Sequence, residues 1–334
     1  MNLLVISENP NRSSFRERIA LYLDALAESG IQCRVESLPA GASARRNLFK
    51  SARESDGVLV HKKGLNLFDA FWLRRYSRKV IYNFDDAIMY DPKRPERFSP
   101  AHFIKFRTMT KLADLVITGN SYLADHARKY NPNVVVWLHG LKVADYACSC
   151  RRPADGKIRL VWIGSKSTLR YLKQIEPALE EIGSRFENVV LRIICDEFFD
   201  LNNMEVEKHV WSAQTRVADL AEADIGLAPL PDDRFTRGKC TFKILEYAAT
   251  GLPAIASPVG AHSDYILDNV NGFLASDNAQ WIESMASLIE DDRLRKTMGT
   301  AAREKVADFD VAVVGKRLCD VIKNCINSNF PVIA

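Results

Sequence analysis

Short apolar runs alternate with helix-length amphipathic segments along almost the whole chain, and this alternation restricts the fold more than any other feature. Runs such as Asn2–Ser7, Gly57–His61 and Lys79–Asn83 have the length of buried strands. Phe15–Ser29 and Tyr171–Arg185, in contrast, have the spacing of helices. A chain that repeats strand and helix in this order forms parallel strands joined by right-handed crossovers. The pattern therefore predicts an α/β fold with doubly wound sheets.

The alternation pauses once, which divides the chain into two parts. Residues 144–157 are polar and rich in turn-forming residues, so we interpret them as an interdomain linker. A second series of strands and helices begins at Ile158–Ile163, and a long amphipathic helix, Val311–Asn327, ends the pattern. We therefore expect two Rossmann-like domains, residues 1–150 and 151–310, facing each other across a cleft, followed by a helical segment at 311–334.

Composition excludes several classes of protein. A chain of 334 residues suits two domains of about 150 residues each. No stretch approaches the roughly 20 consecutive apolar residues of a membrane span, and the first ten residues resemble a strand more than a signal peptide, so we expect a cytoplasmic protein. The seven cysteines contain no CxxC pair, which favours free thiols over disulfides or a zinc site.

Charge is distributed unevenly between the two parts. Residues 1–152 contain 25 Lys and Arg against 15 Asp and Glu, a net charge of +10, whereas the remainder has 21 against 27, a net charge of −6. The basic part suits an anionic partner or surface, or is a solvated basic face. The segment 68–79 combines aromatic residues with four cations, which is typical of peripheral docking on an anionic membrane; an aromatic pair facing the core with an exposed basic side is the alternative. No nucleic-acid-binding module is present, so we expect no nucleic-acid partner.

The segment Leu227–Gly260 carries the most specific chemistry. An expected strand is followed by a polar loop, Asp232–Lys239, which we expect to be exposed, and then by a helix that starts near Thr241. Backbone N–H groups at a helix N-terminus, together with nearby cations, favour a diphosphate. Glu246 lies one turn deeper in the helix, where its carboxylate could accept hydrogen bonds from both hydroxyls of a ribose.

This segment resembles the signature of GT-B glycosyltransferases of family 4 (group 1). The run from Glu246 to Ser257, EYAATGLPAIAS, matches the second half of the family's E-x7-E region, and the later Asn271–Leu274 matches as well. The resemblance implies an N-terminal acceptor domain, a C-terminal donor domain and a final helix, Val311–Asn327, that crosses back to the N-terminal domain. It also implies a hexosyltransferase that needs neither metal nor cofactor.

The activity implied by this resemblance is transfer of a sugar from a nucleotide diphosphate-sugar, most readily a UDP- or GDP-sugar, to a hydroxyl of a sugar or lipid-linked acceptor. The implied role is bacterial polysaccharide, glycolipid or glycoconjugate synthesis, with retention of anomeric configuration. Two positions depart from the pattern. The first Glu of the motif falls on Gly238, which leaves an inverting reaction open, and a basic residue after the first strand of the second domain falls on Ser165.

The donor site implied by the resemblance consists of residues that follow strands of the second domain or lie at the start of its helices. Glu246 is assigned to the ribose. The residues assigned to the donor diphosphate are Lys166, Arg170, Arg237, Lys239, Thr241, Phe242 and Lys243.

The N-terminal part contributes candidates for the acceptor side. Asp85 and Asp86 follow an apolar strand, and either could orient or deprotonate an acceptor hydroxyl; a helix N-cap with one solvated carboxylate is the alternative. His61 ends another strand and is a third catalytic candidate, or a histidine satisfied at the sheet edge. The loop residues Arg12, Ser13 and Ser14 could contact donor or acceptor, although Ser13 could be only an N-cap.

Three other functions remain open from sequence. The departure at Gly238 favours a non-catalytic nucleotide-sugar-binding partner of another transferase, and a GT-B-fold sugar-nucleotide epimerase is a further alternative. An NAD-dependent dehydrogenase is disfavoured because neither first strand–helix turn carries GxGxxG.

Overall fold

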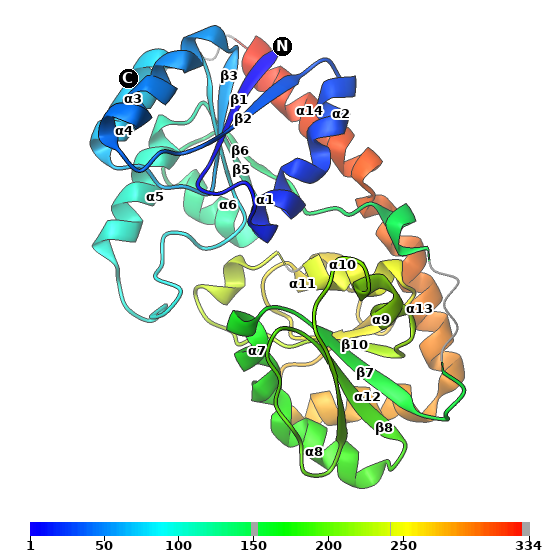
Figure 1. Cartoon of the computed structure of the whole chain (residues 1–334). Helices are drawn as coiled ribbons and strands as arrows, with labels where there is room; N and C mark the ends of the chain where they lie inside the picture. The colour runs from blue at the N-terminus through cyan, green and yellow to red at the C-terminus, as the bar shows by residue number, and fades with distance from the viewer. Residues whose placement is uncertain (148–152, 241, 329–334) are drawn as a thin grey trace. The chain divides into compact units, whose positions relative to one another are not determined.

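The computed structural model describes residues 1–147, 153–240 and 242–328, and it divides the chain into two compact units. Unit 1 contains Met1–Leu141, Asp233–Cys240 and the chain from Val311 onward. Unit 2 contains Lys142–Asp232 and Thr241–Asp310. Each unit is built on a six-stranded sheet, so the expectation of two Rossmann-like α/β domains is confirmed (Figure 1).

The sheet of unit 1 has the strand order β2-β1-β3-β4-β5-β6, and every pair is parallel. Because the order reverses between β1 and β3, the ends of these two strands form the topological switch point of the sheet. Its strands are β1 (Asn2–Ser7), β2 (Gln32–Ser37), β3 (Gly57–His61), β4 (Val80–Phe84), β5 (Leu115–Thr118) and β6 (Val134–Val136).

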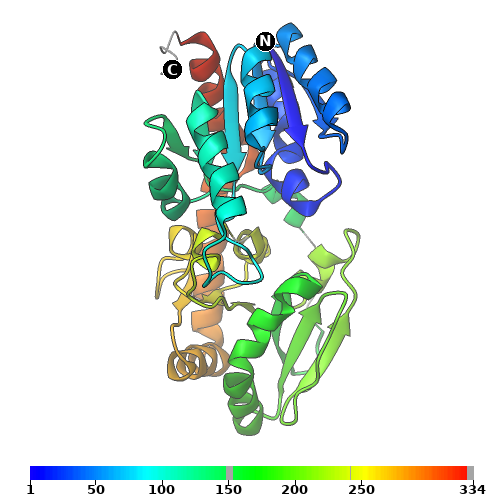
Figure 2. The same cartoon turned by 90° about the vertical axis from the view of Figure 1, so that its left-hand side faces the viewer.

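Helices cover both faces of this sheet. In Figures 1 and 2, α3, α4 and α5 lie together on one side of the strands, and α2 and α14 lie on the other. The first group buries the main core of the unit, in which Phe49, Leu73 and Phe106 pack against the strands. The helices are α1 (Ser13–Arg18), α2 (Leu23–Glu28), α3 (Ala42–Ser51), α4 (Leu67–Tyr76), α5 (Pro100–Leu112), α6 (Ser121–Arg128) and α14 (Val311–Asn327).

The sheet of unit 2 is also parallel and has the order β12-β11-β10-β7-β8-β9. This is the order of a dinucleotide-binding Rossmann sheet, with its switch point between β7 and β10. Its strands are β7 (Ile158–Ile163), β8 (Val189–Ile194), β9 (Glu205–His209), β10 (Ile225–Ala228), β11 (Ala254–Ala256) and β12 (Gly272–Leu274).

Helices also flank the sheet of unit 2, where α8 packs beside α12 and α10 packs beside α13. Trp162, Ile182 and Trp281 belong to its core. The helices are α7 (Lys166–Leu172), α8 (Glu176–Arg185), α9 (Arg216–Ala221), α10 (Phe242–Ala249), α11 (His262–Tyr265), α12 (Asn278–Glu290) and α13 (Asp292–Val306).

Two expected helices are interrupted. The helix expected over Phe15–Ser29 ends at Arg18, because Ile19 leaves the helical conformation, and it restarts at Leu23. The helix expected over Tyr171–Arg185 is divided into α7 and α8, with Pro177 in the first turn of α8. Proline has no N–H to donate to the preceding turn but suits the start of a helix.

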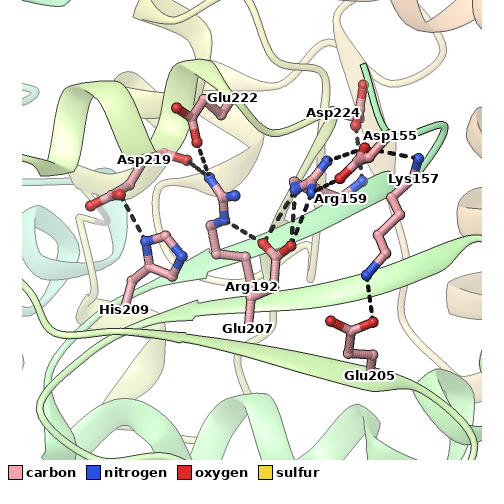
Figure 3. A network of polar contacts seen from close by, with 10 residues as sticks. All are labelled: Asp155, Lys157, Arg159, Arg192, Glu205, Glu207, His209, Asp219, Glu222 and Asp224. Atoms are coloured by element: carbon pink, nitrogen blue, oxygen red, sulfur yellow. Dashed lines mark hydrogen bonds and ion pairs between the residues drawn. The ribbon is translucent and has the colours of Figure 1, made fainter. Parts of the chain in front are cut away.

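A polar network covers the β7–β8–β9 edge of unit 2 (Figure 3). Arg159 on β7 and Arg192 on β8 both donate to the carboxylate of Glu207 on β9, with Nε···Oε distances of 3.1 and 2.8 Å. Asp155 also pairs with Arg159, and Glu222 pairs with Arg192 at 3.2 Å. Both arginine side chains are almost fully buried, so this edge depends on complete pairing of its charges.

Candidate functional site

The carboxyl ends of β7 and β10 form the switch point of unit 2, and the residues expected to bind the donor follow these strands. Gly164, Ser165 and Lys166 come directly after β7, and the loop after β10 leads to α10. Ligands of open α/β sheets bind at such a point. The topology therefore places Lys166 and the start of α10 where this sheet is suited to receive a ligand.

Tyr247 fixes α10 against both strands of the switch point. Its hydroxyl accepts a hydrogen bond from the backbone N–H of Ile163 on β7 at 3.2 Å and donates to the carbonyl of Leu227 on β10 at 3.0 Å. Lys243, one turn earlier, holds its Nζ 4.3 Å from the centre of the Trp162 ring. The first turn of α10, with Phe242 and Lys243, thus lies beside the end of β7.

Glu246 is buried on α10, and one of its oxygens is already held by unit 2. The Tyr146 hydroxyl donates to Glu246 Oε1 at 2.8 Å, and Arg216 Nε lies 3.3 Å from the same oxygen. Burial raises the pKa of the Glu246 carboxyl, while Tyr146 and Arg216 act in the opposite direction. These contacts orient the carboxylate that the sequence assigns to the ribose.

The other predicted phosphate-binding residues of unit 2 are more exposed. Lys166 forms an ion pair with Glu197, which raises the pKa of the lysine. Arg170 lies over the ring of Tyr171, with its guanidinium carbon 5.1 Å from the ring centre. Thr241 lies outside the described residues. Their role at the donor diphosphate stays a prediction.

In unit 1, Asp85 and Asp86 belong to a cluster of charges at the carboxyl ends of β3 and β4. The Lys62 ammonium lies 3.1 Å from Asp85 Oδ1 and also forms an ion pair with Asp86. Lys239 pairs with Asp86 Oδ1 at 2.9 Å. Neither aspartate is an N-cap, because α5 begins only at Pro100. The alternative of a helix cap with a solvated carboxylate is therefore wrong.

The cations keep both carboxylates ionised. Burial alone would raise the pKa of Asp85, but Lys62 and His139 hold it well below its usual value. Burial would likewise raise the pKa of Asp86, and Lys239 and Lys62 lower it. Lys62 has a positive φ of 61°, a conformation that non-glycine residues rarely adopt and that often occurs at functional sites. The cluster thus presents two anionic carboxylates held by two cations.

Two histidines flank this cluster. His139 Nε2 lies 3.4 Å from Asp85 Oδ2. His61 is 3% exposed, and its Nδ1 lies 3.2 Å from the side-chain oxygen of Asn83. Burial lowers the pKa of His61 to about 4, so the ring is neutral near pH 7. A neutral, buried ring suits a supporting role better than direct proton transfer to an acceptor.

The segment Asp233–Cys240 is part of unit 1, although sequence analysis placed it in the second domain and expected an exposed loop. Thr236 and Gly238 are buried, whereas Asp232, Arg234 and Arg237 are exposed, so the expectation of an exposed loop holds only in part. The side-chain amide of Asn120 donates to the backbone carbonyls of Arg237 and Lys239 at 3.0 and 3.3 Å. The segment therefore delivers Lys239 directly to Asp86.

Close packing of this segment explains why position 238 holds glycine in place of the first glutamate of the family motif. A Cβ atom at this position would lie 2.7 Å from the backbone nitrogen of Ala87 and 2.8 Å from its Cβ. No side chain fits at such distances unless the backbone moves. The residue that follows Asp86 therefore occupies the space that a glutamate at position 238 would need.

The loop before α1 is the least organised of the predicted sites. Arg12 pairs with Glu8 at 3.4 Å, and both side chains are well exposed. Ser13 and Ser14 are the first two residues of α1, whose N-cap is Arg12, so Ser13 is not the cap. Nothing in their contacts assigns these three residues to a donor or an acceptor.

Three residues that contact the predicted site residues were not identified from the sequence. Lys62 binds both aspartates, and Tyr146 and Arg216 hold Glu246. Lys62 directly follows an apolar strand, and this position is a sequence signal that could have identified it. Tyr146 lies in the stretch interpreted as a linker, and its distance of 100 residues from Glu246 leaves no local signal.

Residues 149–291 match the family model described as glycosyl transferases group 1. Among curated proteins, D-inositol 3-phosphate glycosyltransferase of Corynebacterium diphtheriae is 33% identical over 76 residues, which cover 22% of this chain and 18% of that protein. The sequence evidence for the group 1 glycosyltransferases is therefore concentrated in the part of the chain that holds the β7–β10 switch point.

Solved structures extend the likeness to nearly the whole chain. Anabaena Alr3699/HepE, in complex with UDP, has a TM-score of 0.72 at 16% identity and covers 97% of this chain and 100% of that one. Sucrose-phosphate synthase of Thermosynechococcus elongatus has a TM-score of 0.73 at 15% identity, covering 97% and 98% of the two chains. This chain has the GT-B fold. Together with the group 1 match, the fold supports the glycosyltransferase class.

The described residues contain neither a metal-binding cluster nor a membrane-spanning helix. Among residues 1–147, 153–240 and 242–328, no group of three or more His, Cys, Asp or Glu side chains could hold a metal ion. Within the same residues, no helix has the length and apolar character needed to cross a membrane.

Proposed function

We propose that this GT-B protein is a glycosyltransferase that moves a sugar from a nucleotide diphosphate-sugar to an acceptor hydroxyl. The observation that carries the proposal is the position of the group 1 sequence match. It spans the Rossmann sheet of unit 2 and includes α10, where Lys243 and Glu246 lie at the switch point. The Anabaena structures with UDP and with UDP-glucose support a UDP-sugar as the first donor to test.

The donor is held by unit 2 in this proposal. The backbone at the start of α10 and the Lys243 ammonium bind the diphosphate, because cations and N–H groups stabilise the charge that grows on the leaving group. Glu246 accepts hydrogen bonds from the ribose through the carboxylate that Tyr146 and Arg216 orient. Lys166 and Arg170 add positive charge near the end of β7.

The acceptor is served by the charge cluster of unit 1. Asp86 is the more accessible of the two aspartates, with 18% of its side chain exposed against 10% for Asp85. A carboxylate with a lowered pKa is a weak base, so Asp86 acts by accepting the hydrogen bond of the acceptor hydroxyl and orienting it. Asp85, Lys62 and Lys239 hold Asp86 in position.

The finer features of the reaction follow the family resemblance. We propose retention of anomeric configuration, transfer of a hexose without a bound metal, and a role in assembling a bacterial polysaccharide, glycolipid or glycoconjugate. The acceptor is then a sugar or a lipid-linked sugar. Gly238 is the position that most directly bears on retention, because the family's first glutamate would stand there.

Gly238 also favours a second candidate, a non-catalytic protein that binds a nucleotide-sugar. The backbone of Ala87 excludes any side chain at position 238, so the carboxylate that normally contacts the transferred sugar has no place here. A protein with this loss would bind the donor through Glu246 and Lys243 but would not turn it over.

A thermal-shift screen with UDP-, GDP-, ADP- and TDP-sugars tests the donor site. A ligand at about 100 times its dissociation constant stabilises the fold by about 2.7 kcal/mol. We expect a shift with one nucleotide class in the wild type and in Glu283→Gln, which changes an exposed carboxylate of α12, and no shift in Glu246→Gln. Absence of a shift with every nucleotide would contradict the proposal.

A further inference from the structure

Helices α4 and α5 border a groove of about 1110 Å³ on unit 1, and none of the residues assigned to the reaction lines it. Its walls come from one face of each helix and from residues 113–114 and 130–133. The residues that the argument uses are Leu67, Phe71 and Arg75 of α4 and Ile104, Arg107 and Lys111 of α5. We call this surface the α4–α5 groove.

Large apolar side chains around the groove are exposed to an unusual degree. The exposed fractions are 69% for Leu67, 59% for Phe68, 58% for Phe71 and 50% for Ile104. Single exposed apolar residues are common, but four within two adjacent helices form a patch of the kind that marks an interaction surface.

The charge around this patch is almost entirely positive. Helices α4 and α5 together contain five cations and one acidic residue, Asp69. Asp69 is buried and pairs with Arg45 at 2.9 Å, and the one carboxylate lining the groove, Asp114, pairs with Arg74 at 2.6 Å. Within the described part of the chain, no carboxylate pairs with Arg75, Arg107 or Lys111, and all three are exposed.

The structure shows which residues of the aromatic and basic segment 68–79 are available for contact at the surface. The Trp72 ring is covered on its faces, unlike the exposed ring of Phe71. The guanidinium carbon of Arg46 lies 3.9 Å from the centre of the Trp72 ring, and the ring of Tyr76 stacks on it with 5.5 Å between ring centres. Arg74 is occupied by Asp114. The patch therefore consists of the outward residues of α4 joined to those of α5, which sequence analysis did not include.

We propose that the α4–α5 groove docks the protein on a bilayer surface that contains anionic phospholipid. Exposed leucine, isoleucine and phenylalanine enter the boundary between headgroups and acyl chains, and the adjacent cations contact the lipid phosphates. A nucleic acid would use the cations but would leave the aliphatic side chains exposed, so the combination favours lipid. This inference does not depend on the proposed transferase activity.

Cosedimentation of the full-length chain with vesicles tests the inference. Vesicles of phosphatidylcholine with phosphatidylglycerol should pellet the protein, vesicles of phosphatidylcholine alone should not, and added salt should weaken the binding. Phe68→Ser/Phe71→Ser should weaken it at least about tenfold. Arg75→Gln/Lys111→Gln should weaken it about fivefold for each cation removed.

A matched control uses the exposed apolar pair Val210 and Trp211 of unit 2. Val210→Ser/Trp211→Ser should bind the anionic vesicles as the wild type does. All substituted positions are at least partly exposed, so circular dichroism should show folded variants. Equal pelleting with both vesicle types, or wild-type binding by both groove variants, would overturn the inference. A wild-type dimer that ignores vesicles and becomes monomeric in Phe68→Ser/Phe71→Ser would also overturn it.

Discussion

Two charge clusters, one in each unit, consist of similar side chains at different positions relative to the strands. In unit 2, Arg159, Arg192 and Glu207 lie within strands and pair across the sheet (Figure 3). In unit 1, Lys62 and Asp85 lie just beyond the ends of β3 and β4. The first cluster joins neighbouring strands, whereas the second brings together the ends of two strands and the separate segment Asp233–Cys240.

The difference indicates which cluster is structural. Residues in mid-strand are fixed by the ladder, as Arg192 is opposite Glu207 in the β8–β9 register, so their charges can do little except stabilise the sheet. Residues beyond the carboxyl ends of parallel strands lie where α/β proteins bind ligands. We therefore expect substitutions in the two clusters to affect different properties.

The largest expected loss of stability comes from breaking the unit 2 cluster. Glu207→Ala removes the carboxylate shared by Arg159 and Arg192, both nearly buried, and should lower the free energy of unfolding by about 3 kcal/mol. Urea denaturation measures the change. Glu205→Ala is the control, because Glu205 on the same strand pairs with Lys157 at the surface, and it should leave the midpoint unchanged. Equal midpoints for the two variants would contradict the structural role.

A smaller loss of stability is expected for a substitution in Asp233–Cys240, the segment that contributes Lys239 to the unit 1 cluster. Gly238→Ala forces a Cβ against the backbone of Ala87 and should cost about 2 kcal/mol of unfolding free energy, again measured in urea. Gly41→Ala is the matched control, because a Cβ there meets nothing within 4 Å. If Gly238→Ala unfolded at the wild-type midpoint, the packing of this segment on Asp86 and Ala87 would be wrong.

The change of stability over one pH unit is the smallest of the three effects. Burial lowers the pKa of His61 from 6.5 to about 4, so the unfolded chain binds a proton in this range that the folded chain does not. Stability should then fall as pH falls from 6.5 toward 4, with His61 contributing about 1 kcal/mol for each pH unit. His61→Gln should show a shallower slope in urea denaturation over this range. Identical slopes would show that His61 is not buried in neutral form.

Much of the fold could be predicted because buried parallel strands are apolar runs. β3 and β7 are examples, since all or nearly all of their residues are buried. β9 was missed because this edge strand, EVEKH, carries three charged residues and lacks an apolar run. β12 was missed because its three residues begin with Gly272, and glycine is depleted in strands. Local pattern therefore predicts strands that contain an apolar run and misses strands that lack one.

The candidate site was predictable only where residues follow a recognisable strand or motif. Asp85 follows a recognisable strand, and Glu246 lies in a recognisable motif. The contacts that determine the chemistry of the two sites could not be predicted, because Lys239 is separated from Asp86 by 153 residues and Tyr146 from Glu246 by 100. Sequence also gave no indication that residues 233–240 pack in unit 1, since their burial depends on Ala87 and Asn120.

The most direct test of the account is release of nucleoside diphosphate from the donor that the thermal-shift screen identifies. A membrane extract would supply acceptors, and wild type would be compared with Asp86→Asn. We expect steady release by the wild type, and release roughly 100-fold slower in Asp86→Asn with donor binding retained, because the acceptor hydroxyl is no longer correctly oriented. Donor binding without release by the wild type would contradict the transferase assignment and favour a non-catalytic binding protein.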